Sequence, residues 1–172
     1  RKLTKVLKVI RFIKIYGPSR TFTKVSARLR FKKGIGLFRR KVKKNVILIG
    51  CGHFTFSTIC HFVIKNYGNP FLACYDIDEG SSKSLAEYYN LDHVIKNQIE
   101  LFDLPETEIV YVASNHASHT PYAIQALEKN LVVHVEKPIS TSRKQFVALI
   151  AAVQKYNGRI SAGYNRPFAA AT

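Results

Sequence analysis

The chain has 172 residues, which is enough for one domain of ordinary size with a buried core and short for two. The sequence has no run of about 18 consecutive apolar residues, as a membrane-spanning helix needs, and its basic start lacks the apolar stretch of a secretory signal. The three cysteines have no metal-ligand spacing, so we expect reduced thiols in a core, with no disulfide framework and no metal site. These properties predict a cytoplasmic protein.

The formal net charge of +16 is concentrated at the start of the chain. Residues 1–45 hold 17 of the 27 Lys and Arg and no acidic residue, which leaves 10 basic residues beside all 11 acidic ones. This change in composition predicts a boundary near Lys44, between a basic segment (1–44) and a nearly neutral domain (45–166).

The basic segment has a helical pattern. Apolar residues at helical spacing alternate with cations, namely Leu3, Val6, Leu7, Ile10 and Ile13 with Lys2, Lys5, Lys8, Arg11 and Lys14. Gly17-Pro18-Ser19 is predicted to end this helix, and a second basic helix is predicted over 22–31. We expect residues 1–31 to lie peripherally on an anionic membrane at its inner face, although the same spacing suits a partner protein equally well. Nucleic acid is not the expected partner.

From Asn45 onward, short β-branched runs alternate with segments of helical period. The predicted strands are 46–50, 71–76, 93–95, 109–113, 131–135 and 159–163, and the predicted helices are 54–66, 82–89, 119–129 and 142–156. Ser81 is the expected N-cap of the second of these helices, and 97–106 receives no element. The pattern predicts an α/β fold, a Rossmann-type doubly wound parallel sheet with helices on both faces.

A glycine-rich turn, Gly50-Cys51-Gly52, joins the first strand to the first helix. In a dinucleotide-binding unit the first glycine permits a tight turn and the second lets the backbone approach the pyrophosphate. His53 then leads into a helix predicted to begin at Phe54, whose free N–H groups attract anions. Thr55 stands where a glycine or alanine is usual, so the turn departs from the common pattern. A glycine turn without any ligand is the plain structural alternative.

Asp76 ends the second predicted strand, 24 residues after Gly52. An acid at this point binds the ribose 2′-hydroxyl of a dinucleotide and repels a 2′-phosphate, so NAD is favoured over NADP. Asp78 could take the same role if the strand ends later.

Polar residues also follow the strand predicted at 109–113, among them Ser114, Asn115 and His119. Ligands of open parallel sheets gather at the carboxyl ends of the strands, so these side chains are candidates for contacts with nicotinamide or ribose. In the plain structural reading, Asn115 organises the turn and His119 or Thr120 caps the next helix.

Glu136-Lys137-Pro138 ends the strand predicted at 131–135. A lysine at this edge of the sheet could polarise a substrate hydroxyl, although a strand-end lysine is more often simply solvated. Pro138 is a candidate for a cis peptide bond.

Together these pieces resemble the glucose-fructose oxidoreductase / inositol dehydrogenase / MocA family, over about residues 44–168. Glu136-Lys137-Pro138 is the most specific element, and the tail 163–168 looks like the segment that leads out of the family's nucleotide domain. The resemblance implies that Lys137 binds substrate and cofactor and assists proton transfer, while hydride passes between a sugar carbon and nicotinamide. It also implies that Arg166 belongs to the site.

The family has a larger C-terminal domain that carries the substrate pocket, and we expect residues 167–172 to be its truncated start. The leading hypothesis is therefore the NAD-binding half of an oxidoreductase for a sugar or nucleotide-sugar, in a polysaccharide pathway and homo-oligomeric when full length. The alternative is a non-catalytic nucleotide-binding regulatory or scaffold module. Retention of Glu136, Lys137 and Arg166 favours the enzyme.

Overall fold

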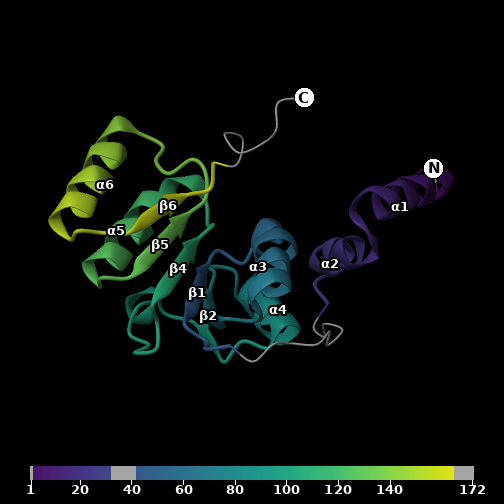
Figure 1. Ribbon diagram of the computed structural model, residues 1–172, viewed down its shortest axis with the longest axis horizontal. Coiled ribbons are helices and arrows are strands. Elements are labelled where there is room, and N and C mark those ends of the chain that lie inside the picture. Colours follow the sequence, from purple (N-terminus) through teal and green to yellow (C-terminus); the bar gives the residue numbers. More distant parts are fainter. Residues whose placement is uncertain (1, 32–41, 165–172) are drawn as a thin grey trace.

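The computed structural model describes residues 2–31 and 42–164, and its centre is a parallel sheet (Figure 1). All six predicted strands are present, in the order β3-β2-β1-β4-β5-β6, and every neighbouring pair is parallel. The strands are β1 (Val46–Ile49), β2 (Phe71–Tyr75), β3 (His93–Ile95), β4 (Ile109–Val112), β5 (Val132–Val135) and β6 (Ile160–Ala162). The predicted Rossmann-type sheet is confirmed.

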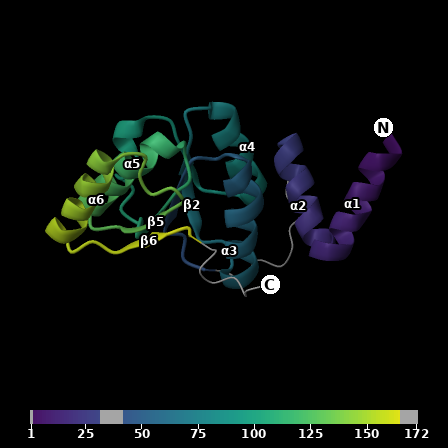
Figure 2. The same cartoon turned by 90° about the horizontal axis from the view of Figure 1, so that it is seen from above.

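Helices cover both faces of this sheet, as the turned view in Figure 2 shows. The helices are α1 (Lys2–Tyr16), α2 (Pro18–Leu29), α3 (Cys60–Tyr67), α4 (Glu79–Tyr89), α5 (His119–Glu128) and α6 (Arg143–Lys155), with a π-helical turn η1 (Thr55–Ile59) before α3 and 3-10 turns η2 (Gln98–Glu100) and η3 (His116–Ser118). The π-helical turn was not predicted. None of the described helices is both long and apolar enough to cross a membrane.

The central strand β1 separates two apolar cores. Ile47 and Ile49 belong to the core under α5 and α6, whereas Val46 and Leu48 belong to the core under η1, α3 and α4. All four side chains are buried, because helices lie on both faces of this strand. This is why the run of four apolar residues lacks the alternation of a half-exposed strand.

The strand order of the sheet reverses between β1 and β4. The chain proceeds from β1 through β2 to β3 on one side, and then returns to β4 on the other side of β1. Ligands of such sheets bind outside the carboxyl ends of the strands at this reversal. The topology therefore places the candidate site above β1 and β4.

Within the basic segment, α1 and α2 form a hairpin on the outer side of α3 (Figure 2). Gly17 separates the two helices with φ of 82°, which confirms the predicted break. The predicted start of the second helix at Phe22 is wrong, because α2 already begins at Pro18. A proline is tolerated in a first helical turn, where its missing N–H would have no partner in the helix.

The predicted start of α4 is also wrong. Asp78, not Ser81, is the N-cap, because its carboxylate accepts hydrogen bonds from Gly80 N at 3.1 Å and from Ser81 Oγ at 2.6 Å. α4 therefore begins at Glu79, three residues before the predicted Ser82. Both residues are good N-caps by type, and only the three-dimensional geometry selects between them.

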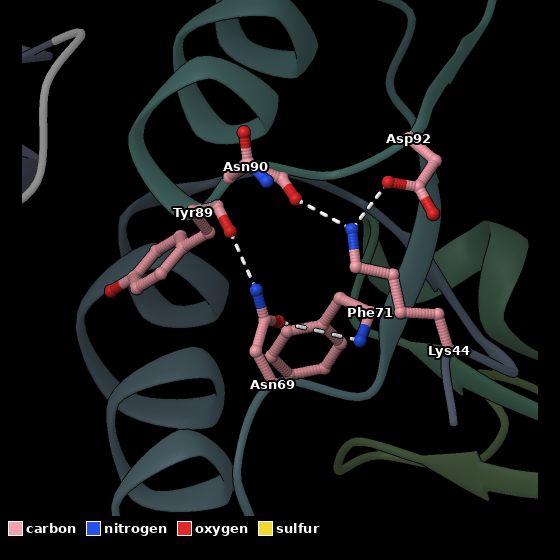
Figure 3. A network of polar contacts seen from close by, with 6 residues as sticks. All are labelled: Lys44, Asn69, Phe71, Tyr89, Asn90 and Asp92. Carbon is pink, nitrogen blue, oxygen red and sulfur yellow. Dashed lines mark hydrogen bonds and ion pairs between the residues drawn. The ribbon is translucent and has the colours of Figure 1, made fainter. Parts of the chain in front are cut away.

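A polar network joins α4 to the first two strands at their amino ends (Figure 3). The buried Asn69 amide donates to Tyr89 O at 2.6 Å, and its oxygen accepts from Phe71 N at 3.4 Å. Lys44 Nζ donates to Asn90 O at 2.8 Å and pairs with the Asp92 carboxylate. These bonds fix the end of α4 against the starts of β1 and β2.

We expect Asn69→Ala to lower the free energy of unfolding by about 1–3 kcal/mol, because the substitution removes two hydrogen bonds from a buried position. Denaturant titration followed by circular dichroism measures the change. Asn66→Ala is the matched control, since Asn66 is exposed and bonds only to Phe62 O within its own helix. An equal loss in both variants would contradict the role of the buried network.

Candidate functional site

A cleft of about 300 Å³ opens at the carboxyl ends of β1, β2 and β4, where the topology places the site. Its walls come from three loops and from α5. The lining residues are Ile49, Gly50, Gly52, Tyr75, Asp76, Ile77, Ala113, Ser114, Asn115, Ser118 and Tyr122. The structure thus brings together five residues that the sequence singled out in separate segments, namely Gly50, Gly52, Asp76, Ser114 and Asn115.

The two glycines of the turn have different roles. Gly50 has φ of 90°, and a Cβ there would lie 2.5 Å from both Ala113 O and Ser114 N. A side chain at Gly50 would therefore push the β1 and β4 loops apart. A Cβ on Gly52 would have no atom within 4 Å, so this residue presents bare backbone to the cleft. Gly50 is required by the protein's own packing, and Gly52 leaves room for a ligand.

Thr55 fits the site despite its departure from the usual small residue. Its side chain is buried, and its hydroxyl donates to Gly50 O at 2.6 Å. It also begins the π-helical turn, in which Cys60 N donates to Thr55 O. His53 and Phe54 lie just before this turn with exposed side chains, and neither lines the cleft.

Asp76 lines the cleft, and Asp78 does not. The Asp76 carboxylate accepts from Cys51 N at 2.6 Å and from Asp78 N at 3.0 Å, so the glycine turn holds it at the rim. The Asp78 carboxylate instead caps α4, and the hydrogen bond from Ser81 lowers its pKa. Of the two acids left open by the sequence, Asp76 is the one placed to meet a ribose.

The loop after β4 forms the opposite wall. Asn115 Oδ1 accepts from Ser118 N at 3.2 Å, and the Ser114 and Ser118 hydroxyls lie 2.7 Å apart. His119 is buried beneath this loop, where its ring nitrogens lie 2.8 Å from Pro138 O and 3.0 Å from Ser114 O. Asn115 therefore both organises the turn and lines the cleft, whereas His119 joins the loops that follow β4 and β5.

Tyrosine and isoleucine side chains supply an apolar part of the wall that sequence reasoning missed. The rings of Tyr75 and Tyr122 meet edge to face at 6.3 Å, beside the exposed Ile77. Burial, with Tyr75 and Asp76 nearby, raises the pKa of Tyr122 to about 12, so the hydroxyl stays neutral. Tyr122 follows the helical period of α5 like any core residue, which left no signal in the sequence.

A second missed residue comes from the N-terminal hairpin. Arg30 follows α2 with φ of 52°, and its guanidinium donates to Cys51 O at 2.9 Å and to Ser81 Oγ at 3.0 Å. It thus connects the glycine turn to the start of α4 from outside the cleft. In the sequence Arg30 is one of many cations of the basic segment, and nothing there separates it from them.

Cys51 lies between the two glycines but is not suited to be a nucleophile. The hydrogen bond with the Cys74 thiol, together with burial, raises the pKa of Cys51 well above its ordinary value. Cys51, Cys60 and Cys74 are all buried and free, as predicted for core thiols.

Glu136 and Lys137 lie apart from the cleft lining, at the end of β5. Glu136 is half-buried, with Oε1 3.8 Å from His134 Nε2, and packs so closely on Gly163 that a Cβ there would lie 2.7 Å away. Lys137 is exposed, and the Lys137-Pro138 bond is cis, as predicted. Arg166, which the sequence analysis assigned to the site, lies outside the described residues.

The cleft fits the adenosine half of a dinucleotide. Gly52 and the helix start offer backbone N–H groups to a pyrophosphate, and Asp76 offers a carboxylate to a ribose diol. Tyr75, Ile77 and Tyr122 offer apolar surface to a flat ring. The lining therefore offers a partner to each part of the adenosine half of NAD, namely the pyrophosphate, the ribose and the adenine ring.

Comparisons with known proteins agree with this geometry. Residues 44–164 match the GFO_IDH_MocA family, described as an oxidoreductase family with an NAD-binding Rossmann fold. An uncharacterized oxidoreductase of Bacillus subtilis is 28% identical over 112 residues, which cover 65% of this chain and 31% of that protein. The inositol 2-dehydrogenase of Acidothermus cellulolyticus is 28% identical over 103 residues, 59% of this chain and 30% of that protein.

Solved structures show the same fold. The myo-inositol 2-dehydrogenase of Lactobacillus plantarum superposes with a TM-score of 0.68 at 17% identity, over 75% of this chain and 38% of that one. The myo-inositol dehydrogenase of Lactobacillus casei, in complex with NAD(H) and myo-inositol, superposes with a TM-score of 0.64 at 19% identity, over 75% and 39%. The chain spans about a third of the length of the curated relatives it matches. It belongs to the Gfo/Idh/MocA oxidoreductase family and contains that family's NAD-binding Rossmann domain.

Proposed function

We propose that this chain is the cofactor-binding half of an NAD-dependent dehydrogenase that acts on a hydroxyl or carbonyl group of a sugar, a nucleotide-sugar or a related polyol. The observation that carries the proposal is the cleft at the reversal point, where Gly52 and Asp76 face the same space. Relatives named as inositol dehydrogenases support a substrate with several hydroxyl groups.

The strand order gives the cofactor a direction across the sheet. Asp76 follows β2, the glycine turn follows β1, and Lys137 follows β5 on the far side of β4. With the adenosine ribose at Asp76 and the pyrophosphate at Gly52, the nicotinamide half extends past Asn115 toward Lys137.

Bound NAD supplies the hydride acceptor, and the residues of this chain supply binding and proton handling. Asp76 accepts hydrogen bonds from the ribose hydroxyls, and Ser114 and Asn115 line the path beyond it. We assign Lys137 the proton transfer at the substrate, because this exposed side chain follows β5 at the nicotinamide end of the path. Its neutral amine would accept the hydroxyl proton when the hydride leaves for NAD, and its ammonium would donate a proton in the reverse reaction. The pair Glu136 and His134 lies beside Lys137, and burial lowers the pKa of His134.

A dehydrogenase must hold its substrate with the reacting atoms about 3–3.5 Å apart, so it needs surfaces on both sides of the nicotinamide. The described residues provide one of these surfaces, and we assign the other to the further length that the curated relatives possess. In this proposal the chain alone binds NAD(H) without turning over a substrate. A non-catalytic module would bind NAD(H) too. A protein that also contains the further length would then show no reduction of NAD that Lys137→Ala could lower.

The first prediction on the cofactor concerns the two glycines. We expect the chain to bind NADH weakly, and Gly52→Val to abolish binding without lowering the melting temperature, since the new side chain enters only the space for the pyrophosphate. Gly50→Ala should lower the melting temperature as well, because its Cβ meets backbone 2.5 Å away. Calorimetry and thermal melts separate the two effects.

The same preparation should leave NAD at its background rate of reduction with inositols, sugars and nucleotide-sugars. Unchanged NADH affinity in Gly52→Val would show that the cleft is not the cofactor site. Turnover by the chain without any partner would contradict the assignment of the second surface of the site to a further length of protein.

The second prediction concerns cofactor choice. The wild-type chain should prefer NADH to NADPH, and Asp76→Ala should weaken NADH binding about tenfold and reduce the preference, because the carboxylate that bonds the ribose diol is gone. Asp78→Asn is the control, since asparagine can still cap α4. Preference for NADPH in the wild type, or an effect confined to Asp78→Asn, would overturn the assignment.

The third prediction concerns Arg30 as a residue that positions the glycine turn. Arg30→Ala should weaken NADH binding about tenfold, because Cys51 O and Ser81 Oγ lose their shared donor. Arg30→Lys should restore part of the affinity, whereas Arg28→Ala, an exposed change on α2, should have no effect. Equal affinity in Arg30→Ala and Arg28→Ala would show that the contact does not shape the turn.

A further inference from the structure

The outer helix of the N-terminal hairpin has an exposed face of mixed character. Leu7, Ile10, Arg11 and Lys14 share one side of α1, because they are spaced three and four residues apart. All four are exposed, and Leu7 is 58% exposed. The flanking Ile13 and Ile15 are exposed too.

The other side of α1 is used to pack on α2. Lys24 Nζ of α2 lies 4.9 Å from the centre of the Phe12 ring, and within α1 this ring lies 4.4 Å from that of Tyr16. Figure 2 shows α1 on the side of α2 that faces away from the sheet. The apolar residues of the exposed face are therefore not accounted for by packing within the described part of the chain.

α2 holds this hairpin firmly on the domain. Arg20 donates to Ser57 O and to Thr58 Oγ1, the latter at 3.1 Å, and its guanidinium lies 4.6 Å from the centre of the Phe62 ring. Thr23 Oγ1 lies 3.0 Å from His61 Nδ1. These contacts of α2 with η1 and α3 thus fix the position of the hairpin, and with it the direction in which the exposed face of α1 points.

The charge and the aliphatic side chains of the N-terminal hairpin together indicate which kind of partner surface the exposed face of α1 suits. Residues 1–31 contain ten Lys and Arg and no acidic residue, so the face of α1 lies in a strongly positive field. Large aliphatic side chains among these cations gain little from a nucleic-acid backbone, which offers phosphate and sugar. They gain from a lipid interface, where aliphatic groups enter the acyl boundary while cations meet anionic headgroups.

We propose that α1 docks onto an anionic lipid surface through Leu7, Ile10, Arg11 and Lys14. This function goes beyond cofactor binding and does not depend on it. α2 acts as the rigid support that keeps the Rossmann domain at a fixed orientation to the lipid.

Vesicle co-sedimentation of the whole chain tests the proposal. We expect phosphatidylcholine vesicles that contain phosphatidylglycerol to bind the chain at least about tenfold more strongly than pure phosphatidylcholine vesicles, with a loss of binding as salt rises. Arg11→Gln with Lys14→Gln should lower the binding about tenfold or more. Leu7→Asn with Ile10→Asn should also lower it, because the apolar residues of the same face are lost.

The chain offers a matched control for each pair. Val147→Asn with Ile150→Asn changes exposed apolar residues of α6, and Lys65→Gln with Lys83→Gln removes two exposed cations from α3 and α4. These controls should bind as the wild type does. All changed side chains are exposed, and thermal melts confirm that each variant is folded.

Three results would overturn the proposal. They are equal binding to neutral and anionic vesicles, α1 variants that bind as well as their controls, and binding to a homopolymeric RNA that is tighter than binding to vesicles and persists in Leu7→Asn with Ile10→Asn. The last result would identify nucleic acid as the partner of the basic segment.

Discussion

The close approach of the β1 loop to the β4 loop determines the rest of the site. Gly50 lies so near the backbone of Ala113 and Ser114 that a single Cβ would separate them. These two loops meet at one side of the cleft, so Asp76 and Asn115 line the same cleft although they follow different strands. The same contact explains why the reversal of strand order becomes a binding site rather than an open gap in the surface.

Sequence reasoning succeeded where function depends on local pattern and on strand order. Gly50 and Asp76 were found because they follow consecutive predicted strands, and parallel strands bring their carboxyl ends together. Tyr122 and Arg30 escaped, because a helix-face tyrosine and one cation among many acquire a role only when distant segments meet. For His119 the sequence left a cofactor contact and a purely structural role open, and in the structure it is buried beneath the loop, where it contacts the carbonyls of two loops.

The N-terminal hairpin is joined to the cofactor domain more closely than its composition indicates. The change in charge near Lys44 marks a boundary in the sequence. In the structure, however, Arg20 of α2 and Arg30 just after it bond to residues on the other side of that boundary, Thr58 and Cys51. A cation-rich segment would ordinarily be assigned to solvent or to a partner. Here two of its arginines donate to backbone carbonyls of the Rossmann domain, at Ser57 and Cys51.

Arg30 makes the position of α2 and the shape of the glycine turn parts of one equilibrium. Its guanidinium holds Cys51 O, and Cys51 N in turn holds the Asp76 carboxylate. If the position of α2 on the domain favours the conformation of the glycine turn that binds a dinucleotide, then a bound dinucleotide favours that position of α2. The two effects have the same free energy, because coupling between two sites is reciprocal. A ligand in the cleft can therefore change how tightly the hairpin packs on the outer side of α3. Conversely, a force or a partner acting on the hairpin can change the position of the Asp76 carboxylate.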